Sequence, residues 1–139
     1  DFEPQAEAIR KITQRYNVAF IGIDTTGLGQ AVYQLVRAFY PAAVGFHYSL
    51  EVKARLVYKA YDVIHKGRLE FDAGHTDLAQ SFMSIKQTTT ESGRHITFKA
   101  GRSEETSHAD LAWATMHALS KEPLEGATTT NRGFMEFSQ

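Results

Sequence analysis

Apolar residues recur three or four positions apart in five segments of the chain, which is the spacing of one helix face. This periodicity predicts helices over residues 3–16, 28–39, 50–66, 77–85 and 107–119. Ser49 suits the N-cap of the third helix, and Gly67 suits its end. The last helix is apolar almost all round, so we expect it to be buried.

Shorter apolar runs between these helices predict strands. Residues 18–23 and 43–48 are continuous apolar runs, typical of strands that are buried on both faces. Residues 68–71 predict a short strand or an extended segment. Because strands alternate with helices, the pattern favours an α/β layered fold in which at least part of the sheet is parallel.

The C-terminal third adds a hairpin and a tail. Residues 87–91 and 95–99 are two short β-type segments on either side of Ser92-Gly93, which predicts a β-hairpin. Residues 121–139 contain proline, glycine and a Thr-rich stretch without periodicity, so we expect a flexible tail. The remaining residues 1–120 are predicted to form one domain.

Composition narrows the classes of function. The 139 residues are 42% hydrophobic and 22% charged, as in ordinary globular proteins, and no apolar run approaches the roughly 20 residues of a membrane helix. The chain has no cysteine, so any metal must bind oxygen or imidazole ligands. The net charge of −1 gives no overall basic field, and any nucleic-acid surface must be local. The first residue is not Met, which suggests a fragment of a longer protein.

Asp24 directly follows the buried strand predicted over residues 18–23. The carboxyl edge of the sheet is where α/β proteins bind ligands, and a desolvated carboxylate there requires a cation or hydrogen-bond donors. Asp24 is therefore a candidate metal ligand. Capping of the next helix by its side chain is an equally reasonable interpretation.

The glycines after Asp24 permit a second interpretation. Gly27-Leu28-Gly29 after a strand is similar to the start of a dinucleotide-binding fingerprint. Val32 occupies the position of the third small residue, and no acidic residue ends the next predicted strand. The match is weak.

Asp110 lies near the start of the apolar last helix. A carboxylate in the first turn interacts favourably with the helix dipole, which is its simplest role. Alternatively, the helix carries Asp110 to the sheet edge beside Asp24, where two carboxylates would repel each other unless a divalent cation lay between them.

Two sequence motifs resemble those of the large terminase subunit of tailed bacteriophages. They are IGIDTTGLG over residues 21–29 and SHADLAWA over residues 107–114, with KARLV over residues 53–57 leading to GRL over residues 67–69. The order and separation of these segments match the family, and the similarity extends over about residues 1–120.

The resemblance implies a ribonuclease H-like nuclease: an α/β layered fold with a mixed sheet flanked by helices. Asp24 and Asp110 match the family's catalytic, metal-binding acids, and the metal would be Mg²⁺ or Mn²⁺, typically as two ions about 4 Å apart. The family has a further catalytic aspartate on the first strand of the sheet. No residue here matches it, so the N-terminal strand is expected to be missing.

The resemblance also implies a biological setting. The reaction would be cleavage of double-stranded, concatemeric DNA during genome packaging in the host cell cytoplasm. The partners would be a packaging ATPase domain in the same polypeptide, the portal protein and the small terminase subunit, with no membrane involved.

A few other residues are candidates for supporting roles. Lys53, Arg55, Arg94, Lys99 and Arg102 could contact DNA phosphates, although a single basic residue is more often simply solvated. His108, two residues before Asp110, could orient that carboxylate or help to bind metal, although a buried or capping histidine is the safer interpretation.

Two hypotheses of other classes remain at this stage. The chain could be a non-catalytic docking module for a portal or motor partner. It could also be a small nucleotide-binding domain that uses Gly27–Gly29.

Overall fold

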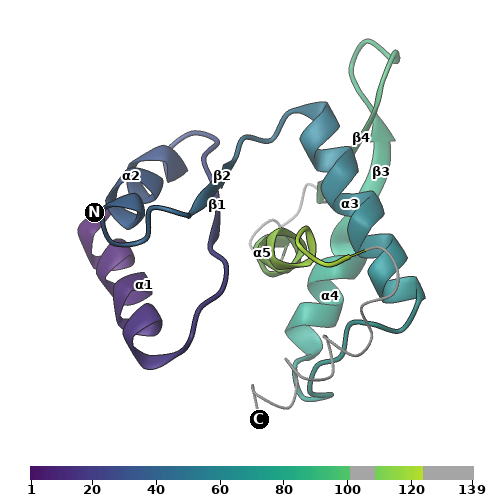
Figure 1. Ribbon diagram of the computed structural model, residues 1–139. Coiled ribbons are helices and arrows are strands. Elements are labelled where there is room, and N and C mark those ends of the chain that lie inside the picture. Colours follow the sequence, from purple (N-terminus) through teal and green to yellow (C-terminus); the bar gives the residue numbers. More distant parts are fainter. Residues whose placement is uncertain (101–108, 124–139) are drawn as a thin grey trace.

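The computed structural model describes residues 1–100 and 109–123 (Figure 1). Along the chain its elements are α1 (Glu3–Arg15), β1 (Gly22–Asp24), α2 (Gly29–Phe39), β2 (Val44–Phe46), α3 (Leu50–His65), α4 (Thr76–Ser84), β3 (Ile85–Thr89), β4 (Ile96–Ala100) and α5 (Ala109–Leu119). The five predicted helices are confirmed, with ends that differ by one or two residues. Residues 107 and 108 of the predicted last helix lie outside the described residues, as do residues 124–139 of the predicted tail.

Strands β1 and β2 form a parallel pair between two groups of helices (Figure 1). Side chains alternate between the two faces of β1, as expected for a strand buried on both sides. Ile21 and Ile23 pack with α1 and α2 around Val36, which is fully buried. Phe20 packs on the other face, in the core of α3 and α5.

The second core contains the three later helices. It is centred on Leu56 and Val63 of α3 and on Ala112 and Met116 of α5, all of them buried. Phe46 of β2 joins this core and connects it to the parallel strands. Helix α5 therefore lies between the β1–β2 pair and the α3–α4 layer (Figure 1).

Both ends of α3 confirm the sequence prediction. The Ser49 hydroxyl accepts a hydrogen bond from the Val52 N–H at 3.2 Å, as an N-cap does. At the other end Gly67 has a φ of 69°, and the Arg68 N–H donates to the Val63 carbonyl at 3.0 Å. This left-handed residue closes the helix at low steric cost because glycine has no side chain.

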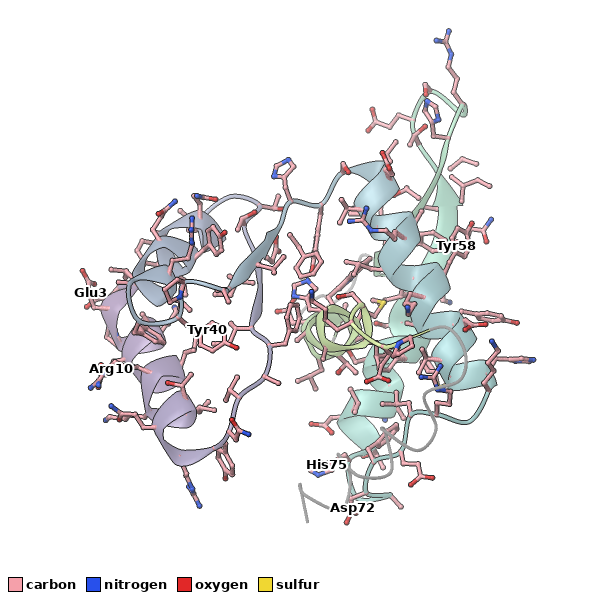
Figure 2. All side chains as sticks on the ribbon, in the orientation of Figure 1. Glu3, Arg10, Tyr40, Tyr58, Asp72 and His75 are labelled. Atoms are coloured by element: carbon pink, nitrogen blue, oxygen red, sulfur yellow. The ribbon has the colours of Figure 1, made fainter. Side chains whose placement is uncertain are left out.

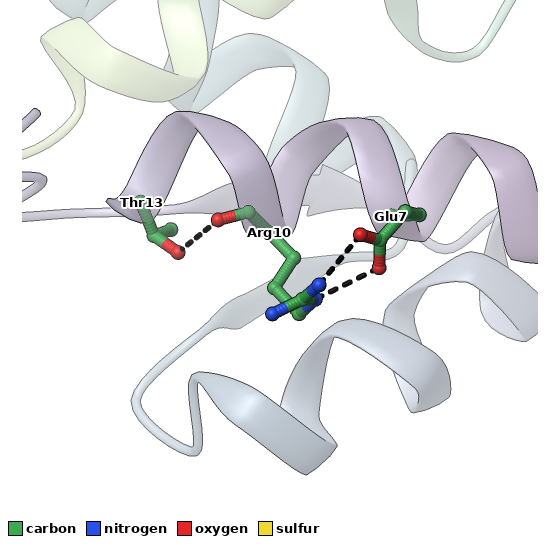
Figure 3. Close-up of polar contacts among 3 residues, drawn as sticks. All are labelled: Glu7, Arg10 and Thr13. Carbon is green, nitrogen blue, oxygen red and sulfur yellow. Dashed lines mark hydrogen bonds and ion pairs between the residues drawn. The ribbon is translucent and has the colours of Figure 1, made fainter. Parts of the chain in front are cut away.

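Two polar contacts lie within the N-terminal part of the chain, in α1, in α2 and in the segment before β1. The hydroxyl of Tyr40, labelled in Figure 2, donates to the Val18 carbonyl at 3.3 Å and ties the end of α2 to the segment before β1. On α1, Arg10 forms a bidentate pair with Glu7, at 2.8 and 2.6 Å (Figure 3). This pair lies on the solvent side of α1, where exposed ion pairs contribute little to stability.

The hairpin is confirmed as β3 and β4, antiparallel, with Lys86 opposite Lys99 and Thr88 opposite Thr97. It packs along α3, where Phe98 meets the ring of Tyr58 edge-on at 5.6 Å. The turn of the hairpin projects past the N-terminal end of α3 (Figure 1).

Three sequence predictions need correction. The described strands form two separate two-stranded sheets, β1–β2 and β3–β4, where we expected one mixed sheet. Residues 18–21 of the predicted strand lie outside β1, although the Ile21 carbonyl accepts a hydrogen bond from the Val44 N–H at 2.9 Å. Residues 68–71 contain no strand, which leaves the alternative of an extended segment. Helix α5 is buried on one side only, since Leu111, Ala114 and Ala118 are exposed.

Candidate active site

Asp24 is the last residue of β1 and is half-buried. Its Oδ1 accepts a hydrogen bond from the Thr26 N–H at 2.8 Å, which closes a tight turn. The capping interpretation is therefore wrong, since α2 begins five residues after Asp24 and has no side-chain cap. The described residues supply no hydrogen-bond donor to Oδ2, so this oxygen is available to a ligand.

One of the glycines that follow Asp24, Gly29, has a steric explanation. A Cβ on Gly29 would clash with the carbonyl oxygen of Asp24, because the turn folds the start of α2 onto the end of β1. The glycine is thus required for the backbone approach that holds Asp24 in place. Binding of a nucleotide is not needed to account for it.

Asp110 lies in the first turn of α5 and is exposed. No side-chain hydrogen bond from a described residue restrains it. The helix turn that carries it is fixed from α4, because the Ala112 N–H donates to the hydroxyl of Ser81 at 2.8 Å. Ser81 is fully buried, and no sequence pattern singled it out, since serine is common on helix surfaces.

Tyr48 follows β2 and connects the two acid-bearing regions. Its N–H donates to the Thr26 hydroxyl at 3.0 Å, and its ring packs on Trp113 of α5 at 5.1 Å. Burial raises the pKa of Tyr48, and the negative charges of Asp24 and Asp110 raise it further. Tyr48 therefore joins the segment that follows Asp24 to the helix that carries Asp110.

His117 is buried beneath this tyrosine. Its Nε2 lies 2.6 Å from the Tyr48 hydroxyl, its Nδ1 lies 3.4 Å from the Gly22 carbonyl, and its ring stacks on Phe46. Burial lowers the pKa of His117, against the opposing effects of the Gly22 carbonyl and the Asp24 charge. No sequence pattern points to His117, because no residues with metal-type spacing surround it.

The described residues contain no group of three or more acidic, histidine or cysteine side chains that could hold a metal ion. Asp24 and Asp110 are thus an incomplete ligand set by themselves. His108 and Arg102 lie outside the described residues. Of the other predicted basic residues, Arg55, Arg94 and Lys99 are exposed and Lys53 is half-buried.

A groove of about 330 Å³ lies beside β1. Ile9 and Ile12 of α1 line one side, and Ala114 and Ala118 of α5 line the other. Because these helices cover opposite faces of β1, the groove follows the edge of the strand that is not paired with β2. In the described structure this edge has no neighbouring strand.

Comparison with known proteins gives the family. The model of the terminase RNaseH-like domain matches residues 1–122. The chain belongs to this family. The ribonuclease H-like fold class and the terminase resemblance are therefore confirmed, and the dinucleotide-binding interpretation has no remaining support.

Relatives of this terminase domain are much longer than the chain. It is 59% identical over 130 residues to the terminase ATPase subunit of Escherichia phage P2, covering 94% of this chain and 22% of that protein. It is 40% identical over 121 residues to the probable terminase ATPase subunit of Haemophilus phage HP1 (strain HP1c1), covering 86% and 20%. The chain therefore spans about a fifth of the length of these curated relatives.

A solved structure shares the fold. The crystal structure of the large terminase nuclease from thermophilic phage G20c with bound cobalt matches with a TM-score of 0.71 and 19% sequence identity. The match covers 87% of this chain and 62% of that one. In the described part of this terminase domain, none of the helices has the length and hydrophobicity that a membrane span requires.

Proposed function

We propose that this domain is a metal-dependent endonuclease that cuts double-stranded, concatemeric DNA during phage genome packaging. Asp24 and Asp110 are its metal-binding, catalytic carboxylates. The observation that carries the proposal is that Tyr48 connects the two acid-bearing segments, since its N–H binds the Thr26 hydroxyl and its ring packs on Trp113, although the two acids are 86 residues apart in the sequence. Membership of the terminase RNaseH-like family supports a nuclease reaction.

The chemistry of the donor atoms fits Mg²⁺ or Mn²⁺. Both candidates are carboxylates, hard oxygen ligands that these ions prefer, and Oδ2 of Asp24 has no competing donor among the described residues. The cobalt bound to the large terminase nuclease of phage G20c supports a divalent metal at this fold. Such a metal would activate water and stabilise the leaving oxygen during phosphodiester cleavage. Asp24 and Asp110 would hold it, and the turn at Thr26 orients Asp24.

Two carboxylates do not complete such a site. We propose that a further carboxylate is supplied by a segment outside this sequence, as the family resemblance implies for the first strand of the sheet. The apolar groove along the free edge of β1 supports this proposal, because a strand paired there would run beside Gly22 and Asp24.

Contacts to DNA phosphates are proposed for basic residues of α3 and of the hairpin. Arg94 and Lys99 are exposed on the hairpin, and Lys53 and Arg55 are on α3. Arg102 lies outside the described residues, and its contact with DNA is proposed from the sequence alone. Phosphate contacts suit an enzyme that needs little base-specific readout.

The wider assignment follows from the relatives, which are named as ATPase subunits of phage terminases. We propose that the domain acts next to a packaging ATPase in the same polypeptide, in the host cell cytoplasm. Its partners there would be the portal protein and the small terminase subunit.

The test is a calorimetric titration with Mn²⁺, in this chain and in a polypeptide of the relatives' length that carries it. Asp24→Asn and Asp110→Asn should each reduce Mn²⁺ affinity at least about tenfold, since each removes a charged ligand. The chain offers matched controls. Asp72 closes the same kind of turn through the Gly74 N–H at 2.7 Å, and Asp77 lies in the first turn of α4. Figure 2 shows Asp72 at the other end of the molecule from the hairpin.

Asp72→Asn and Asp77→Asn should leave Mn²⁺ binding unchanged. If the longer polypeptide binds Mn²⁺ equally in all four variants, Asp24 and Asp110 are not the ligands. Mn²⁺-dependent nicking of plasmid DNA then separates an enzyme from a docking module. A longer polypeptide that binds the portal but never cuts DNA would favour the docking module.

A further inference from the structure

A chain of hydrogen bonds links β1, α5 and the end of β2, and the metal-binding proposal does not use it. A carbonyl oxygen only accepts, so His117 must donate from Nδ1 to the Gly22 carbonyl. In a neutral imidazole the other nitrogen, Nε2, is then the acceptor. The Tyr48 O–H therefore donates to Nε2 at 2.6 Å. Tyr48, His117 and Gly22 thus form a directed relay, here called the Tyr48–His117 relay.

The relay joins the two elements that carry the acids, β1 and α5. Gly22 precedes Asp24 by two residues in β1. His117 follows Asp110 by seven residues, so it lies two turns along the same face of α5, about 10 Å along the helix axis. Tyr48 completes the connection, because its N–H binds Thr26 beside Asp24 and its ring packs on Trp113 beside Asp110.

We infer that the Tyr48–His117 relay is a positioning device that fixes the separation of Asp24 and Asp110, and so the geometry of the metal site between them. This inference rests on the proposed nuclease function. Tyr48 and His117 act through the elements that carry the acids. Neither is a ligand in this scheme.

Core packing alone does not require these polar groups. Phenylalanine and leucine would fill the same space without the cost of burying a hydroxyl and an imidazole. The relay instead supplies direction, because hydrogen bonds fix the position of α5 along β1 in a way that apolar contacts do not. His117 is only 5% exposed, so its ring has little freedom to adopt another arrangement.

The test compares Tyr48→Phe, His117→Gln and the double variant with Tyr61→Phe. The control is matched, since Tyr61 also contacts a histidine ring, stacking on His65 at 5.4 Å, but is 66% exposed on α3. In the longer polypeptide, Tyr48→Phe should raise the Mn²⁺ concentration for half-maximal cutting about tenfold, the lower end of the effect of outer-shell partners. The Kd for DNA without metal should not change.

The double variant should lose no more Mn²⁺ affinity than His117→Gln alone, because the hydroxyl acts through the imidazole. Losses that multiply in the double variant, or an equal loss in Tyr61→Phe, would overturn the inference. An unchanged Mn²⁺ requirement in Tyr48→Phe would overturn it as well.

A metal-free measurement keeps the inference separate from the proposed nuclease activity. The 139-residue chain has no cysteine, so spin labels can be placed at Gln30→Cys and Leu111→Cys, exposed positions in the first turns of α2 and α5. We expect Tyr48→Phe to broaden the distance distribution between the labels, and Tyr61→Phe to leave it narrow. An unchanged distribution in Tyr48→Phe would refute positioning, whether or not the longer polypeptide cuts DNA. Failure of that polypeptide to cut would refute only the nuclease function.

Discussion

At the scale of single residues, Gly22 permits a close contact beside the candidate site because it has no side chain. A Cβ on Gly22 would lie 2.7 Å from Cε2 of Phe46 and 3.1 Å from Cβ of His117. Helix α5 can approach β1 this closely only because residue 22 is glycine. The glycine before the strand-end acid in the IGIDTTGLG motif therefore has a steric explanation, independent of any ligand.

We expect Gly22→Ala to destabilise the domain by about 1–3 kcal/mol, the usual cost of forcing an extra methyl group into a packed core. The ring of Phe46 and the backbone of α5 would both have to move. Thermal unfolding of the chain measures the effect. Gly74→Ala is the control, because its nearest neighbour is the movable carboxylate of Asp72 at 3.1 Å, and it should change stability by less than about 0.5 kcal/mol. Equal shifts in Tm would contradict the proposed contact.

At the scale of elements, the position of α5 depends on polar contacts from its neighbours. The buried hydroxyl of Ser81 on α4 accepts a hydrogen bond from the Ala112 N–H in the first turn of α5 at 2.8 Å. Asp110 is carried by the same turn. Helix α4 thus fixes the start of α5, while the Tyr48–His117 relay fixes it two turns later.

Ser81→Ala should cost about 0.5–1.5 kcal/mol, because it removes a buried hydrogen bond between α4 and α5. Hydrogen exchange of the Ala112 amide should accelerate more than that of Met116 in the middle of α5. Ser84→Ala is the matched control on the same helix, since the Ser84 hydroxyl binds only the Ser81 carbonyl of its own helix, at 2.7 Å. If both variants lose the same stability, Ser81 has no special role for α5.

The elements also show what the sequence could predict. Local periodicity predicted all five helices, the cap at Ser49 and the hairpin, because each depends on residues close together in the chain. The pairing of the strands was predicted less well, since it depends on which strands lie beside β1. Ser81 and His117 were missed because their partners, Ala112 and Gly22, are 31 and 95 residues away. Whether Asp24 and Asp110 bind metal stays a prediction.

At the scale of the whole molecule, a net charge of −1 leaves DNA binding to local groups of basic residues. The hairpin holds such a group. Lys86 and Lys99 face each other across β3 and β4, and both are exposed. Like charges placed directly opposite each other destabilise a strand pair, so this arrangement has a cost in the free protein. A bound phosphate would relieve the repulsion, which favours a role of the hairpin in DNA binding.

This arrangement predicts that stability and DNA binding change in opposite directions. Lys99→Glu would replace the repulsion with a cross-strand ion pair and should stabilise the domain by about 0.2–1 kcal/mol. The same change should weaken DNA binding and reduce the slope of log K against log salt by about 1, because a phosphate contact is lost. Lys11→Glu, an exposed change of equal charge on α1, is the control and should alter neither the salt slope nor the Tm appreciably. If Lys99→Glu raises the Tm but binds DNA with the original salt slope, the hairpin is not part of the DNA surface, and the basic residues of α3 become the first alternative.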